Sequence, residues 1–160
     1  AEAIEYIRAQ GKFIEYRQVL AVDVEGATAI HSGPNSLGIW TQAQARDVAS
    51  GGNMLANDLV PQAIVNGFLN SSGHLGDRLI AAMRAGLSAG GEAGPLHSAG
   101  MLMVDKLAWP VAELRCDWTD DCPIETVATA WNVYKPQMDA YVQRAIDPRD
   151  APSYGVPGDE

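Results

Sequence analysis

Apolar and polar positions alternate along the chain in two rhythms, one typical of strands and one typical of helices. The first residues have a helical rhythm, with Ala3, Ile4 and Ile7 on one stripe that Gly11 ends. Residues 17–24 and 27–33 resemble strands instead, and Glu25-Gly26 between them predicts a hairpin with a two-residue turn. A further strand is predicted over residues 37–45, after a Gly-Pro-Asn turn.

Two helices are predicted in the middle of the chain, over residues 58–69 and 77–87. Pro61 is compatible with the first helix because it falls in the first turn, where a missing N–H costs nothing. The two helices should form a pair, since only a short polar linker separates them. The apolar stripes that predict them comprise Val60, Ile64 and Phe68 in the first, and Leu79, Ile80, Met83 and Leu87 in the second.

The stretch AGLSAGGEAGPLHSAGMLMV, residues 85–104, combines a glycine-rich loop with a short apolar run that predicts a buried strand. A phosphate-binding loop runs from a strand into a helix, whereas this loop follows a helix and precedes a strand. Gly86, Gly90 and Gly91 are therefore interpreted as residues that end the helix, because glycine adopts positive φ without a Cβ clash. The sequence indicates no nucleotide site here and no other cofactor.

The last third of the chain predicts one more strand, two helices and a tail. Residues 111–118 alternate strictly, as a strand with one polar face does. Pro123 and Glu125 favour a helix start, and Pro136 should interrupt that helix before it resumes over residues 137–146. Residues 147–160 are rich in proline and should form an extended tail. The stripe of the first of these helices is Ile124, Val127, Trp131 and Tyr134.

Strands and helices in blocks predict an α+β fold, with two sheets between helix layers, because the apolar strands need cover on both faces. We expect one domain over residues 1–146, followed by the tail. The tail carries Tyr154 and Val156 as apolar anchors, so it should lie against its own domain or a neighbouring subunit of a homo-oligomer.

The net charge of the chain limits the kinds of molecule that it is expected to bind. The formal net charge is -9 with only 11 Lys and Arg, so neither nucleic acid nor an anionic membrane is an expected partner. No apolar run is long enough for a membrane helix, and a cytoplasmic location is expected. The three histidines lack ligand spacing, so no metal site is expected. Cys116 and Cys122 lack a CxxC spacing and are interpreted as reduced thiols.

The candidate functional residues lie at the ends of predicted elements, where loops line sites. Glu92 stands in the glycine-rich loop and the pair His97 and Ser98 opens the following strand, so they could hold a substrate or orient a reacting group. Asn53 follows two glycines and could donate to an oxyanion or stabilise a turn. We expect Glu92 and His97 to face one cleft with Asn53 nearby. The candidates for binding are Ser98, His31 at a strand end, and Arg115 and Asp117 on one strand face, where a solvated or subunit-facing role is the alternative.

Five segments of the chain, taken together, resemble a known family. They are YRQVLAVDVEGATAIHSG, GGNMLAN, residues 78–104, LRCDW and PQMDAYVQRAIDPRDAPSYGVPGD. The family is the bacterial one known as domain of unknown function 1028. That family is grouped with the Ntn-hydrolase-like proteins, whose fold is a four-layer αββα sandwich. The resemblance implies this sandwich for the chain, and amide-bond hydrolysis by analogy of fold. Fold alone does not fix a reaction.

The resemblance also implies that a part of the family's domain precedes the matched segment. Ntn hydrolases use an N-terminal Thr, Ser or Cys, whereas Ala1 has no nucleophilic atom. The nucleophile is therefore expected outside this chain, which would be a fragment, a processed half with a second chain, or a sequence without its earlier residues. Two hypotheses remain. One is an Ntn-type amide hydrolase of small acyl-amino-acid, peptide-like or cyclic amide substrates. The other is a non-catalytic small-molecule-binding or structural protein of the same fold.

Overall fold

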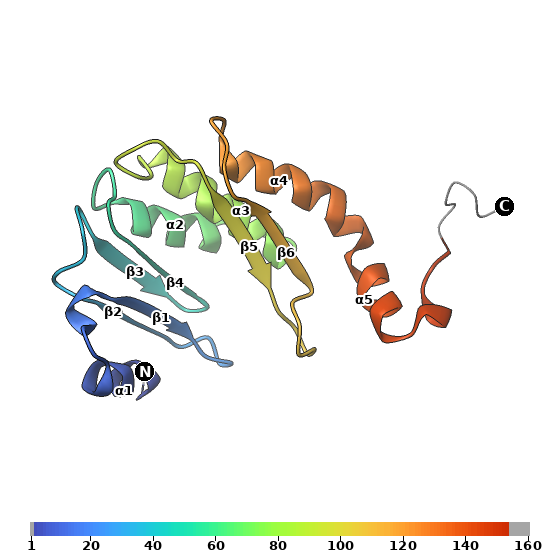
Figure 1. Ribbon diagram of the computed structural model, residues 1–160, viewed down its shortest axis with the longest axis horizontal. Helices are drawn as coiled ribbons and strands as arrows, with labels where there is room; N and C mark the ends of the chain where they lie inside the picture. Colours follow the sequence, from blue (N-terminus) through green and yellow to red (C-terminus); the bar gives the residue numbers. More distant parts are fainter. Residues whose placement is uncertain (1, 154–160) are drawn as a thin grey trace. The chain divides into compact units, whose positions relative to one another are not determined.

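The computed structural model describes residues 2–153 (Figure 1). The chain divides into two compact units, Ala1–Leu96 and His97–Glu160, each of which is described by itself. Both units combine helices with antiparallel hairpins, which confirms the predicted α+β class. None of the helices in residues 2–153 is long and apolar enough to cross a membrane.

The first unit begins with helix α1 (Glu2–Gln10) and continues into a hairpin of β1 (Gln18–Val22) and β2 (Thr28–Ser32). Helix α1 ends before Gly11, as predicted, and it packs against this hairpin. The turn is longer than the two residues expected, because Asp23 N–H donates to the Ala27 carbonyl and leaves three residues between them. The Asp23 carboxylate accepts N–H bonds inside the turn, and Gly26 takes a φ of 81°, which glycine adopts without strain.

A second hairpin, β3 (Thr41–Ala45) and β4 (Val48–Gly52), packs against the first. The predicted strand over residues 37–45 is thus only partly formed, and β4 was not predicted at all. Two side chains of the first hairpin hold the second: the Gln18 amide donates to the Gly52 carbonyl at 3.2 Å, and the Thr28 hydroxyl donates to the Ala45 carbonyl at 3.3 Å. Leu20 lies over Gly51, where an added Cβ would be 3.5 Å from Leu20 Cδ2, an ordinary contact distance.

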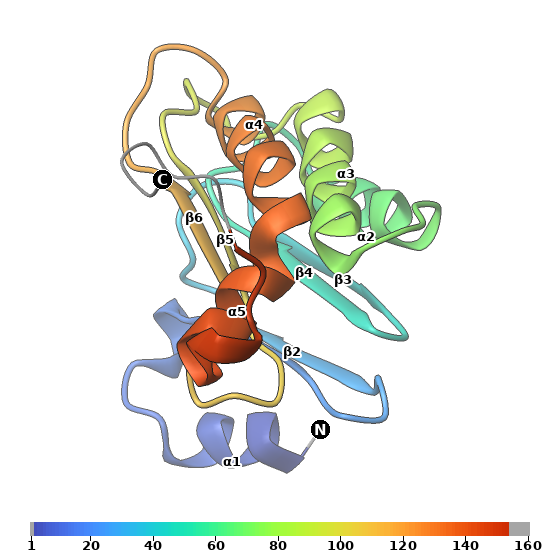
Figure 2. The ribbon, with the colours of Figure 1, turned by 90° about the vertical axis from the view of Figure 1, so that its right-hand side faces the viewer.

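Helices α2 (Val60–Leu69) and α3 (Leu75–Ser88) confirm the predicted helix pair and lie beside each other in both ribbon views (Figures 1 and 2). Helix α2 packs on β3 and β4. His74 caps α3, since its ring nitrogen Nδ1 accepts the Gly76 N–H while the Asp77 carboxylate accepts the His74 N–H. The core of this unit consists of Val48, Val65, Phe68 and Ala82, with Ala43, Ala45, Ile64 and Leu79 packed against it.

Helix α3 departs from its prediction at two places. Met83 and Leu87 of the predicted stripe are 44% and 39% exposed, whereas Ile80 is buried. Gly86 does not end the helix but lies inside it, buried, where an added Cβ would come within 2.6 Å of Ile64 Cγ1. Its role is close helix packing. Gly90 and Gly91 follow the helix with φ of 127° and 63°, as a helix-ending pair should.

The second unit consists of a hairpin, β5 (Ala99–Met103) and β6 (Ala112–Cys116), and of helices α4 (Pro123–Tyr134) and α5 (Met138–Ile146). All four elements were predicted. Helix α4 packs on both strands. The 3-10 turn η2 (Lys135–Gln137) contains Pro136 and separates α4 from α5, which confirms the predicted interruption. The buried residues of α4 are Pro123, Ile124, Val127, Ala128 and Trp131.

The C-terminal tail begins with a second 3-10 turn, η3 (Pro148–Asp150), rather than with extended chain. The Asp147 carboxylate caps it by accepting the Arg149 N–H. The Asp147 side chain also accepts from the Arg149 guanidinium, and this hydrogen bond lowers the pKa of Asp147. Tyr154 and Val156, the expected apolar anchors, lie outside the described residues.

Candidate functional site

The candidate site of the second unit is a group of side chains at one end of the β5–β6 hairpin. His97 lies two residues before the start of β5, and Trp118, Thr119 and Asp120 follow β6. Antiparallel pairing places Ala99 opposite Cys116, so the start of β5 and the end of β6 meet. The backbone continues this contact, because Thr119 N–H donates to the His97 carbonyl at 2.9 Å.

The His97 ring is held by three neighbours. Its Nδ1 lies 2.8 Å from the Thr119 carbonyl oxygen, and its ring stacks on Trp118 with the centroids 4.0 Å apart and the planes 10° from parallel. Asp120 Oδ1 lies 3.7 Å from the same Nδ1. The His97 side chain is 28% exposed, so solvent and small molecules reach it although its orientation is fixed.

The hydrogen bond to Thr119 assigns the tautomer of His97. A carbonyl oxygen only accepts, so Nδ1 must carry the hydrogen. In the neutral ring the lone pair is then on Nε2, which can accept a proton and return it. A histidine with one nitrogen bonded to a backbone acceptor and the other available has the arrangement of a general acid–base group.

The three other polar candidates of this unit lie on the outer face of the hairpin. Arg115 donates to Asp117 at 2.7 Å, and both side chains are exposed. This hydrogen bond, together with the charge of Asp117, raises the pKa of the Arg115 guanidinium. By strand alternation Ser98 shares the face of Gly100, which pairs with Arg115. The ion pair fits the solvated role considered for this face.

In the first unit, Asn53 and Glu92 lie in loops that run beside each other. Leu55 and Glu92 form an isolated antiparallel bridge, and Ala93 N–H donates to the Met54 carbonyl at 2.8 Å. The Asn53 amide donates to the Leu37 carbonyl at 3.4 Å, which is the turn-stabilising role that the sequence also allowed. His97 belongs to the other unit, so its expected placement in one cleft with Glu92 and Asn53 stays a prediction.

His31, on β2, has a structural contact as well. Its Nε2 lies 2.9 Å from the Ile14 carbonyl oxygen, so the ring ties the hairpin to the 3-10 turn η1 (Ile14–Tyr16). Because a carbonyl accepts, Nε2 carries the hydrogen and Nδ1 the lone pair. Within residues 2–153 no group of His, Cys, Asp or Glu side chains is placed to hold a metal ion, and Cys116 and Cys122 are free thiols.

Sequence reasoning missed the partners of His97 and one further residue, Asn57. The Asn57 amide donates to the Ala89 carbonyl at 2.7 Å, and its oxygen accepts the Leu59 N–H at 2.9 Å. It therefore joins the end of α3 to the start of α2. The strand prediction contained a signal for Trp118, because an antiparallel pair must bring residue 118 near residue 97, but nothing in the sequence orients the ring.

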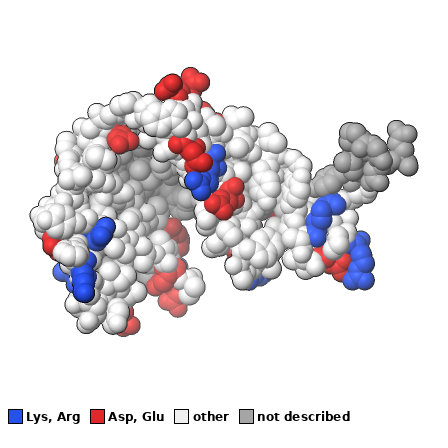
Figure 3. Space-filling view, in the orientation of Figure 1, with Lys and Arg blue, Asp and Glu red and all other residues white. Residues whose placement is uncertain are grey.

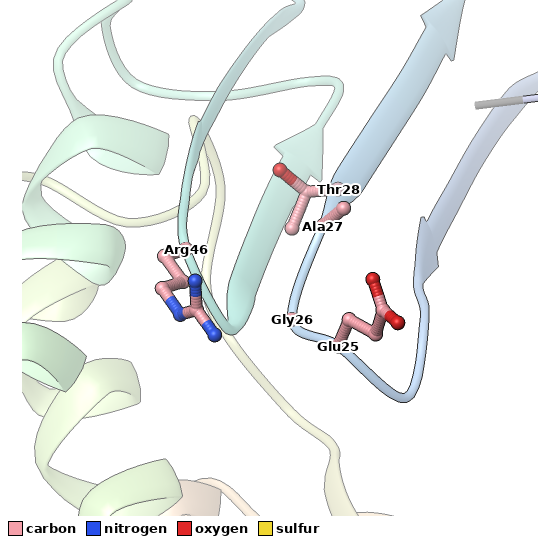
Figure 4. A pocket seen from close by; sticks show the side chains of 5 residues that line it. All are labelled: Glu25, Gly26, Ala27, Thr28 and Arg46. Atoms are coloured by element: carbon pink, nitrogen blue, oxygen red, sulfur yellow. The ribbon is translucent and has the colours of Figure 1, made fainter.

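A hollow of about 600 Å³ lies at the tips of the two hairpins of the first unit. Figure 4 shows Glu25 and Arg46 on its two sides, with Gly26, Ala27 and Thr28 along the hairpin between them. It contains none of the predicted residues. Its backbone is engaged in holding the hairpins together, since the Gly26 carbonyl accepts the Asp47 N–H at 2.9 Å. We therefore assign it to the packing of the two hairpins.

Comparison with known proteins places this arrangement in a family. Residues 1–127 match the family of unknown function DUF1028. The chain belongs to this family. The DUF1028 match includes all seven candidate residues together with Trp118, Thr119 and Asp120, and it stops within α4. Comparison with curated proteins gave no match.

A solved structure of the same family is similar to the chain. It is the crystal structure of protein SPO2555 from Silicibacter pomeroyi, a DUF1028 protein, with 28% sequence identity and a TM-score of 0.74. The similarity covers 84% of this chain and 59% of that protein, so this chain spans less than two thirds of that relative's length.

Proposed function

We propose that the chain belongs to an Ntn-type amide-bond hydrolase. The substrate would be a small acyl-amino acid, a peptide-like amide or a cyclic amide. The observation that carries this proposal is the geometry of His97, whose Nδ1 is bound to the Thr119 carbonyl, so that the lone pair of the neutral ring lies on Nε2. Amide hydrolysis requires a proton for the departing nitrogen, and Nε2 can deliver one after it has accepted the proton that the attacking nucleophile gives up.

The finer fold proposal is the four-layer αββα sandwich. Its support lies in the packing of the first unit: α1 lies on the β1–β2 hairpin, that hairpin packs against the β3–β4 hairpin, and α2 covers β3 and β4. These contacts support the order helix, sheet, sheet, helix within this unit (Figure 1). In such sandwiches, loops at strand ends line the space between sheets, where Asn53 remains a candidate oxyanion donor and Glu92 a candidate substrate contact.

A non-catalytic binding protein is the second candidate. The observation that favours it is that Asn53 already donates to a backbone carbonyl and Arg115 is already paired with Asp117. Neither side chain then needs a substrate to complete its hydrogen bonds. Under this alternative, the protein would be a small-molecule-binding or structural protein of the same fold that catalyses no reaction.

The test is an assay of the natural protein that contains this chain against N-acyl amino acids, dipeptides and cyclic amides. We expect turnover of at least one class, and a loss of kcat of roughly 10²- to 10⁴-fold in His97→Gln. The matched control is His74→Asn, which removes another imidazole but keeps a residue that caps α3 well. Binding without turnover, or full activity in His97→Gln, would refute the hydrolase proposal.

A further inference from the structure

Trp118 is the aromatic residue of the His97 site and is unusually accessible. It is 70% exposed, although burying a tryptophan is strongly favourable. One face of its indole is stacked on the His97 ring. The remaining exposed surface is a rigid aromatic platform directly beside the proposed proton-transfer group.

The charges around this platform are negative. Asp120 contacts the edge of the stacked imidazole, at 3.7 Å from Nδ1, and its side chain is 92% exposed. Asp121 is exposed next to it, and its N–H is fixed by the Thr119 hydroxyl. The nearest basic residue along the strand, Arg115, is already neutralised by Asp117. The formal net charge of the whole chain is -9, and Figure 3 shows acidic side chains dispersed over one face, with basic side chains among them.

An electron-rich indole face near exposed carboxylates attracts a positive charge. Cations bind over the face of tryptophan more favourably than over other aromatic rings, and neighbouring carboxylates add a Coulomb attraction. An anionic ligand would meet repulsion at the same place. The platform therefore discriminates by charge as well as by shape.

We propose that the exposed face of Trp118, with Asp120, binds an ammonium or guanidinium group of the substrate. This inference rests on the proposed function and narrows its substrate class to amides that carry a positive charge close to the bond that is broken. Free amines and basic amino-acid side chains satisfy this requirement. Acyl-amino acids whose only charge is a carboxylate do not.

The test compares N-acetyl-lysine methylamide with N-acetyl-norleucine methylamide, an uncharged analogue that has the same carbon chain but lacks the terminal ammonium group. Binding to the natural protein is followed through the indole N–H signal of Trp118 in nuclear magnetic resonance spectra and through calorimetry. We expect the cationic probe to bind roughly fivefold more tightly, which is the size of an exposed cation–π contact. Trp118→Leu should abolish this preference, and Asp120→Asn should reduce it.

Two matched controls lie in the loop at the other end of the same hairpin. Trp109→Leu removes a partly exposed tryptophan and Asp105→Asn an exposed carboxylate, and both should leave the preference unchanged. Equal binding of the two probes, tighter binding of the neutral probe, or a preference that survives in Trp118→Leu would overturn the inference.

Binding and hydrolysis are measured separately, so the two proposals can fail independently. Charge-selective binding at Trp118 without turnover of any amide would support the inference and refute the hydrolase. Turnover of neutral and cationic amides with equal kcat/KM, and no selective binding, would support the hydrolase and refute the inference about Trp118.

Discussion

Gly67 on α2 lies at a close contact between α2 and α3, and Gly67→Ala is a direct test of that contact. A Cβ added at Gly67 would lie 2.6 Å from the Cβ of Ala85, 3.1 Å from the Ala81 carbonyl oxygen and 3.1 Å from the Ala82 Cα. None of these atoms is the end of a flexible side chain. The strain cannot be relieved by a rotamer change, so the two helices must move apart.

Two opposing effects set the magnitude. Alanine is favoured over glycine inside a helix by about 1 kcal/mol. Inserting a methyl group into a closely packed contact costs about 1–3 kcal/mol, and contact with main-chain and Cβ atoms places this site near the upper value. The expected net effect of Gly67→Ala is a loss of about 2 kcal/mol in the free energy of unfolding. For a chain of this length, that corresponds to a decrease of about 4–8 °C in Tm.

Urea unfolding followed by circular dichroism measures this loss in the full chain. Gly94→Ala is the control, since the same methyl group at Gly94 meets nothing within 4 Å. Combining Gly67→Ala with Ala85→Gly removes the shortest contact, so the double variant should lose less stability than the sum of the two single variants. A Gly67→Ala variant as stable as the wild type, or two changes that simply add, would show that the helix contact is not as close as described.

Two further predictions concern local contacts. Gly26→Ala should destabilise the first hairpin by about 1 kcal/mol or more, because an added Cβ would overlap the Asp47 carboxylate and Gly26 has a positive φ; an unchanged urea midpoint would contradict this. Burial raises the pKa of Tyr134, whose hydroxyl donates to the Val111 carbonyl at 2.8 Å. The folded state therefore holds this proton more tightly than the unfolded chain, so the stabilisation is complete below the unfolded pKa of about 10 and is lost as the pH rises above it. Tyr134→Phe should lose less stability between pH 9 and pH 12 than the wild type, and equal losses would refute the assignment.

Local pattern was sufficient to predict most helices and strands, and it failed where tertiary packing decides. Strand β4 reads VASGG, which has one β-branched residue and two glycines, so it lacks the pattern of a strand. It forms because β3 pairs with it through a short turn and because Val48 joins the core. Gly86 was interpreted as a helix end for the same reason: its neighbour Ile64 lies on another helix and is invisible to local pattern.

In the candidate site as well, some features follow from local sequence pattern and others are decided by tertiary contacts. The apolar run after His97 predicted the strand, which begins two residues later, at Ala99. Its hydrogen-bond partner, the Thr119 carbonyl, is 22 residues further along the chain. Its tautomer depends on that partner alone, so the property that matters for chemistry could not be predicted from the residues around His97. Similarly, the ion pair between Arg115 and Asp117 depends on the rotamers of both side chains. The alternation of polar and apolar residues along the strand does not determine those rotamers.

Each sheet of the described chain pairs two strands that are consecutive in the sequence. Forming such a pair requires closure of a short loop only, which costs little chain entropy and takes microseconds for an isolated hairpin. The three hairpins can therefore form early and independently during folding. The slower events are then the long-range ones, in which Gln18 reaches the Gly52 carbonyl and α2 settles on β3 and β4. Substitutions at such docking contacts should change the folding rate more than substitutions within the turns.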